Sequence, residues 1–178
     1  MLFRFALPVA AMAAALLSAC AQMPGGGAGA TASAQMKPTA GNAAAGTVRF
    51  EQSGNKVIVT ASVTGLKPNA EHGFHVHERG DCSAPDATSA GGHFNPGGKP
   101  HAKYDKAERH SGDMPNLRAD AAGTARVMWE TDVLTVGSGP ANVIGRAVVI
   151  HRDPDDYASQ PAGNSGARIS CGVIVASG

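Results

Sequence analysis

The stretch GTVRFEQSGNKVIVTASVTGL, residues 46–66, decides the fold class. Its second half alternates, so that one face of a strand would carry Val57, Val59, Ala61 and Val63. Because successive side chains of a β-strand point to opposite faces, this period of two predicts a two-sided strand. Gly54 and Asn55 separate it from the preceding apolar run, and they predict a hairpin turn between two antiparallel strands.

Similar short runs recur on both sides of this hairpin. They cover residues 33–38, 72–78, 123–131, 143–151 and 169–176. The chain holds 23 Gly and 11 Pro but only 4% aromatic residues, a composition that favours many turns. No stretch of the sequence shows a sustained apolar stripe at helical spacing with capping residues. The sequence therefore predicts an all-β fold, either a β-sandwich or a flattened barrel.

Two long segments, residues 78–116 and 151–168, interrupt the strand pattern and are rich in Gly, Pro and His. Loops of this length inside a compact domain are usually functional, or are held by ligands or a disulfide. The chain has seven histidines: His72, His75, His77, His93, His101, His110 and His151. We therefore expect several of them to meet in space.

Two of these histidines, His75 and His77, would share one face of a strand about 7 Å apart. Three more lie in the first long loop, and His151 ends a later strand. Asp113 follows His110 by three residues, a spacing that suits two ligands on one turn of irregular chain. Neutral imidazole suits copper and zinc, whereas calcium and magnesium sites need several carboxylates. The pattern predicts a copper or zinc site.

The charge balance gives no support for nucleic-acid binding. The net charge is +1, and apart from Arg4 the remaining 14 Lys and Arg balance the 14 Asp and Glu. A nucleic-acid partner would call for a basic excess.

The N-terminus predicts export. Residues 1–19 read as a signal peptide, with Arg4 followed by an apolar stretch that is short for a membrane-spanning helix. LSAC, residues 17–20, resembles the bacterial lipobox, which predicts a lipid on Cys20; the alternative is ordinary cleavage near Ala19 or Ala21. Residues 20–32 predict a flexible tether rich in Gly and Ala, and residues 33–178 the folded domain.

The cysteine count fits this interpretation. Lipidation of Cys20 would leave Cys82 and Cys171, which are then available for one disulfide in an oxidising compartment. Closing a loop of this length is worth on the order of 4–5 kcal/mol in the chain-entropy model. The alternative is two separate buried thiols.

Several ordered motifs resemble the copper/zinc superoxide dismutases. They are GFHVHE (73–78), GGHFNP (91–96), RHSGDMPNL (109–117), IGRAVVIHRDPDD (144–156) and GARISCGVI (166–174). The resemblance covers nearly all of the chain from residue 33 onward, and the close spacing of His77 and Cys82 is more similar to bacterial periplasmic forms. It implies a Greek-key β-sandwich, or flattened eight-stranded barrel, with two long functional loops.

The resemblance also implies the site. One copper per subunit would be held by His75, His77, His93 and His151. One zinc per subunit would be held by His93, His101, His110 and Asp113. His93 would bridge the metals and take part in catalysis, and Arg168 would guide the substrate, superoxide. Asp155 would hydrogen-bond His75 and His101, and Cys82 would pair with Cys171.

The expected location rests on the N-terminal signal, with Ala21 after Cys20 in place of an acidic residue, while the expected assembly rests on the resemblance. We expect a bacterial periplasmic lipoprotein on the outer membrane, with a homodimer as one option for its assembly. Residues 157–166 contain no Lys or Glu. Either the long-range attraction of superoxide is weaker here, or it comes from elsewhere, with Lys99, Lys103, Lys106 and Arg109 as candidates. Two other functions remain open at this point: a non-catalytic module that buffers copper or zinc, and a structural dismutase-like domain.

Overall fold

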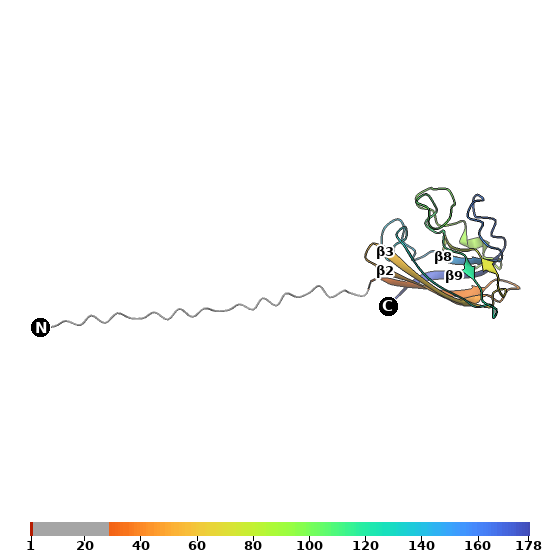
Figure 1. The fold of residues 1–178 in the computed structure, drawn as a ribbon, viewed down its shortest axis with the longest axis horizontal. Helices are drawn as coiled ribbons and strands as arrows, with labels where there is room; N and C mark the ends of the chain where they lie inside the picture. The colour runs from red at the N-terminus through yellow and green to blue at the C-terminus, as the bar shows by residue number, and fades with distance from the viewer. Residues whose placement is uncertain (2–28) are drawn as a thin grey trace.

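The computed structural model describes Met1 and residues 29–178 (Figure 1). The predicted signal peptide, Cys20 and most of the predicted tether lie outside the described residues. The described part contains one short 3-10 helix, Thr88–Ala90, and nine strands: β1 Thr31–Pro38, β2 Ala45–Ser53, β3 Lys56–Thr64, β4 Glu71–His72, β5 Phe74–His77, β6 Leu117–Arg118, β7 Ala125–Thr131, β8 Ala147–His151 and β9 Arg168–Ser177. Within it, no helix is long and apolar enough to span a bilayer. The all-β prediction is confirmed.

Seven of these strands form one antiparallel sheet in the order β5-β8-β9-β1-β2-β3-β7. The sheet curls into a half-barrel, and the two long loops rise together beyond β8 and β9 (Figure 1). The remaining strands, β4 and β6, form a separate two-stranded ribbon. The described residues thus hold seven strands plus two, where the sequence predicted eight.

The additional strand arises because the predicted run 72–78 divides at Gly73 into β4 and β5. The N–H of Gly73 donates to Asp153 at 2.8 Å, and its carbonyl accepts from the N–H of His151 at 2.8 Å. A Cβ at Gly73 would lie 2.7 Å from the Ser165 hydroxyl oxygen, so only glycine fits there. The chain before Gly73 pairs with β6, and the chain after it pairs with β8.

The hairpin of residues 46–66 is confirmed. Strands β2 and β3 pair down to Ser53 and Lys56, and Gly54 turns the chain with a φ of 58°. The predicted inner face of β3 is buried: Val57, Val59, Ala61 and Val63 are each at most 1% exposed.

Several strand boundaries differ from the sequence prediction by a few residues, among them the starts of β1 and β8. Strand β1 begins at Thr31 instead of Ser33, because Thr31 pairs with Glu51 on one side and with Ser177 on the other. Strand β8 begins at Ala147 because residues 143–146 form a turn, closed by a 3.0 Å bond from the Arg146 N–H to the Val143 carbonyl. Pairing partners and turn bonds, which an apolar pattern does not show, set both boundaries.

Two apolar layers lie on the opposite faces of β8. Val148 and Ile150 point into the main core inside the curl. Ala147 and Val149 point outward and pack against Cys171 and two small residues of the first long loop, Ala87 and Ala90. The outer face of β5, β8 and β9 is therefore covered by loop, and side chains on that face are buried without entering the main core.

Removing a large side chain from the main core tests this packing. Phe50 on β2 is fully buried, so Phe50→Ala should lower the free energy of unfolding by about 3–5 kcal/mol in a urea titration. Met128 on β7 is 76% exposed, and Met128→Ala should change it by no more than about 0.5 kcal/mol. Equal, small effects of both substitutions would contradict the described core.

Candidate metal centre

Strands β5 and β8 place three histidines on the loop-covered outer face. His75 and His77 alternate with Phe74 and Val76, whose side chains enter the main core. All four residues are buried, so the strand has no solvent-exposed side. His151 ends β8, where the register with β9 shifts after Ile150. Alternation along β8 places His151 on the same outer face as Ala147 and Val149, and the ring centroids of His75 and His151 lie 5.0 Å apart.

The first long loop adds a fourth histidine by pairing along the free edge of β5. The N–H of Phe94 donates to the Val76 carbonyl at 2.8 Å, and the N–H of Glu78 donates to Gly92 at 2.9 Å. These bonds bring His93 opposite His77. The ring centroids of His75 and His93 are 4.0 Å apart.

The two groups of possible ligands share one residue. One nitrogen from each member of the first group lies within 4.8 Å of the others: His75, His77, His93 and His151. The same limit holds for one donor atom from each member of the second group: His93, His101, His110 and Asp113. These are the two sets expected from the sequence, and the structure brings all of their members together.

In the first group, the hydrogen bonds leave lone pairs that face one another. The Nδ1 atoms of His77 and His151 lie 2.9 and 3.1 Å from backbone carbonyls, which fixes the proton on Nδ1. Their Nε2 atoms then carry lone pairs, yet they lie only 3.4 Å apart. His75 Nδ1 and His93 Nε2 are buried and have no hydrogen-bond partner in the described structure. Such an arrangement fits a cation bound among the four nitrogens.

The second group gathers around one carboxylate. His93 Nδ1 and His101 Nδ1 lie 2.9 and 3.0 Å from Asp113 Oδ1. Asp113 is held in place because its other oxygen accepts the N–H of His110 at 3.0 Å. Three nitrogens and one carboxylate oxygen are a donor set that suits tetrahedral zinc, so this group fits that ion.

Asp155 connects the two groups. Its Oδ2 lies 2.8 Å from His75 Nε2, and its Oδ1 lies 3.0 Å from His101 Nε2. It therefore fixes both rings so that their Nδ1 atoms point into the two candidate sites, as the sequence analysis expected.

Burial sets the protonation of these rings. Burial, followed by the neighbouring His93, lowers the pKa of His75 to about 3, and burial lowers the pKa of His151 to about 4. Burial also opposes a proton on His101, but hydrogen bonds to Asp113 and Asp155 outweigh it and raise the pKa of His101 to about 9. The rings of the first group are thus neutral and can bind a cation directly. His101 must first lose a proton before it can bind a cation.

Comparisons with known proteins agree with this geometry. A family model described as copper/zinc superoxide dismutase (SODC) matches residues 44–174. The chain is 45% identical over 133 residues to the copper–zinc superoxide dismutase 2 of Aquifex aeolicus (strain VF5), covering 72% of this chain and 78% of that protein. It is 45% identical over 136 residues to the copper–zinc superoxide dismutase 2 of Brassica juncea, covering 72% and 88%.

The chain belongs to the copper/zinc superoxide dismutase family. The fold agrees as well, because the structure of a double mutant of a SOD-like protein from Bacillus subtilis matches with a TM-score of 0.73. That match is 37% identical and covers 80% of this chain and 96% of the other. Copper and zinc are the cofactors of this family, and both donor groups fit them.

Arg168 lines a cavity beside the candidate metal ligands. A cavity of about 430 Å³ is lined by Arg168 together with His77, His93 and His151. The guanidinium donates to the carbonyls of Ala87 and Gly91, both at 2.7 Å. These bonds hold the charge at the cavity wall and leave its remaining donors for an anion.

The other cations suggested by the sequence do not line this cavity. Lys99 and Lys103 form ion pairs with Glu108 and Asp105, and Arg109 is buried. Among the described residues, Arg168 is the only Lys or Arg that lines the cavity. Long-range attraction of superoxide by the other four stays a prediction.

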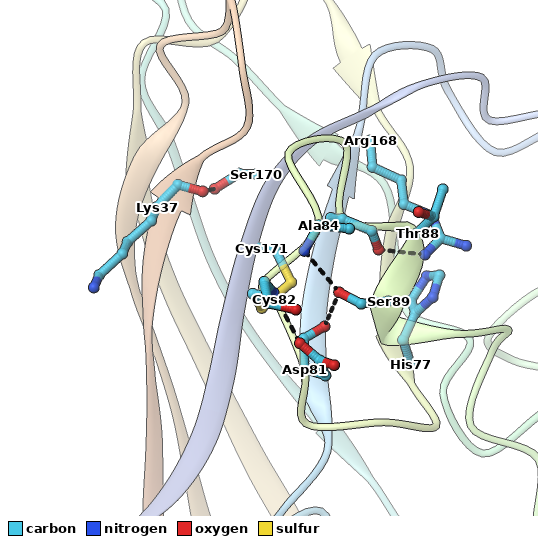
Figure 2. The surroundings of a disulfide bond; sticks show 12 residues. Lys37, His77, Asp81, Cys82, Ala84, Thr88, Ser89, Arg168, Ser170 and Cys171 are labelled. Atoms are coloured by element: carbon cyan, nitrogen blue, oxygen red, sulfur yellow. Dashed lines mark hydrogen bonds between the residues drawn. A yellow bond between two sulfur atoms is a disulfide. The ribbon is translucent and has the colours of Figure 1, made fainter.

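A disulfide between Cys82 and Cys171 joins the first long loop to β9. Figure 2 shows it on one side of the short helical turn that carries Ser89, with Arg168 on the other side. Ser89 ties this loop together, since its hydroxyl donates to the Asp81 carbonyl at 2.9 Å and accepts the Ala84 N–H at 3.1 Å. The predicted pairing is confirmed, and the loop it anchors carries the carbonyls that hold Arg168.

Several contacts around the site were not found by sequence reasoning. The Gly91 carbonyl accepts hydrogen bonds from both His77 and Arg168, so a single backbone atom holds a candidate ligand and the guanidinium side by side. Asn116 was quoted within a motif but given no role, although its side chain pairs with the backbone of Asp155. A backbone carbonyl has no signature in a sequence, and a lone amide side chain has many other uses.

Asp155→Asn tests the link between the two groups. The amide cannot accept from both rings at once, so we expect zinc and copper affinities, measured by competition with chelators, to fall about 10- to 100-fold. Asp153→Asn, which removes only a surface ion pair with Arg152, serves as the control. Affinities that match the control would show that Asp155 does not orient the ligands.

Proposed function

We propose that this protein dismutates superoxide to dioxygen and hydrogen peroxide at a copper held by His75, His77, His93 and His151. A zinc would be held by His93, His101, His110 and Asp113, with one ion of each kind per subunit. The observation that carries this assignment is the orientation of His93. Its Nδ1 faces the Asp113 group, and its Nε2 is buried on the side of the other three histidines.

When bound, copper would exchange one electron with each of two successive superoxide anions, while zinc would keep the His93 ring in place. Arg168 would attract each anion into the cavity and orient it by charge-assisted hydrogen bonds. Its position does not depend on the substrate, because two backbone carbonyls already hold it.

Protons must reach the second anion for peroxide to leave, since two protons are consumed in each cycle. His93 lies at the cavity, and its Nε2 can take up a proton there and pass it on. Asp155, His75 and His101 are tied together by hydrogen bonds and would keep their orientation meanwhile. The chain thus supplies an anion site and a proton carrier around the same cavity.

His151→Ala tests the assignment. His151 belongs only to the first group, so the variant should lose bound copper and the ability to accelerate superoxide decay while it keeps its zinc. Metal content and superoxide decay are measured on the same sample, with Met128→Ala as the control. Retained activity would refute the copper site. Wild-type protein that binds copper tightly but leaves superoxide decay unchanged would instead favour a metal buffer.

We further propose that the chain is exported, as in bacterial forms, and that a lipid on Cys20 anchors it on the periplasmic side of the outer membrane. The lipobox-like LSAC supports the lipid, and Ala21 in place of an acidic residue supports the outer membrane. The disulfide is consistent with an oxidising compartment. A homodimer is also proposed, on the family resemblance, and sedimentation of the mature domain tests it.

Cys20→Ser tests the anchor in bacterial cells that make the protein. We expect the wild type in the outer-membrane fraction, with a mature N-terminus whose mass includes a lipid, and the variant without either. A wild-type protein that is soluble in the periplasm and begins near Ala21 without added mass would show ordinary signal cleavage instead.

A further inference from the structure

Gln160 joins the two long loops through a pair of hydrogen bonds to the backbone of His101. The His101 N–H donates to Gln160 Oε1 at 2.9 Å, and Gln160 Nε2 donates to the His101 carbonyl at 2.7 Å. The two residues are 59 positions apart in the chain. A side-chain amide that matches one residue's donor and acceptor at once fixes both distance and orientation.

A reciprocal contact runs between the same loops. Asn116 ends the first loop, and its side-chain amide pairs in the same way with the backbone of Asp155, with both bonds at 3.0 Å. The Asp155 carboxylate in turn contacts His101 Nε2. His101 is therefore held by the second loop at its backbone through Gln160 and at its ring through Asp155.

The residues after Gln160 form part of the cavity wall. Pro161 and Ala162 line the cavity that contains Arg168. Gly163 follows, and a Cβ there would lie 1.7 Å from Asp155 Oδ1 and 2.9 Å from His101 Nε2. The wall segment thus runs from Gln160, which is bonded to the His101 backbone, to Gly163, which has no room for a side chain beside Asp155 and His101.

We infer that Gln160 is a positioning residue that couples the position of this wall, Pro161 and Ala162, to the position of His101. The inference rests on the proposed function, in which His101 holds zinc. Zinc at His101 then sets how closely Pro161 and Ala162 approach the anion in front of Arg168. A wall that lies close excludes water and strengthens the attraction between Arg168 and the anion. A wall that moves freely weakens that attraction.

Gln160→Met tests the inference, because methionine keeps the length of the side chain and removes both hydrogen bonds; Gln160→Ala is the second variant. The control is Ser159→Ala. It removes two side-chain hydrogen bonds within the second loop, one donated to Asp156 and one accepted from Asn164. In copper- and zinc-loaded protein we expect zinc release to a chelator to become about tenfold faster in both Gln160 variants. The dissociation constant of azide, a probe anion read by its absorption band with copper, should rise about three- to tenfold.

The coupling itself is tested by removing zinc. In copper-loaded, zinc-free protein, zinc no longer fixes the position of His101, so the bond between Gln160 and His101 no longer fixes the position of the wall. The azide dissociation constants of wild type and Gln160→Met should then converge. Zinc release and azide binding that match Ser159→Ala in both Gln160 variants would overturn the inference, while wild-type metal binding and dismutation would leave the proposed function intact. A difference in azide binding that persists without zinc would also overturn it.

Discussion

The His93 ring is the constraint on which the rest of the site depends. One imidazole must offer Nδ1 to the Asp113 group and Nε2 to three other histidines, so both groups must be built around its plane. A small rotation of that ring would move Nδ1 or Nε2 away from the group that it faces. The pairing of the loop along β5 fixes the backbone on either side of His93, and the contact of Nδ1 with Asp113 orients the ring.

The sheet and the loops supply different metal ligands. The rigid sheet supplies His75, His77 and His151, while the loops supply the remaining ligands and cover the site. Loops are ordinarily the least ordered part of a β-protein, and here three kinds of contact hold them. The disulfide anchors one end, Asp155 binds rings from both groups, and the carbonyls of Ala87 and Gly91 hold Arg168. The anion site is therefore fixed by the same loop contacts that fix the metal ligands.

Much of this was accessible from the sequence, and the remainder was not, for physical reasons. The alternation over residues 57–63 predicts a strand, because a strand that is buried on one face carries apolar side chains at every second position. The ligand residues follow from long, ordered motifs. The division at Gly73 and the two-residue strands β4 and β6 depend on partners far away in the chain. The same is true of Gln160, a single exposed amide whose role appears only when His101 lies opposite it.

A crystal structure of the oxidised, metal-loaded protein, with anomalous scattering recorded at the copper and zinc edges, tests the central claim most directly. The account predicts two peaks on opposite sides of the His93 ring, copper beside Nε2 and zinc beside Nδ1, each about 2.0–2.1 Å away. A single peak, or two peaks of which only one touches His93, would contradict it.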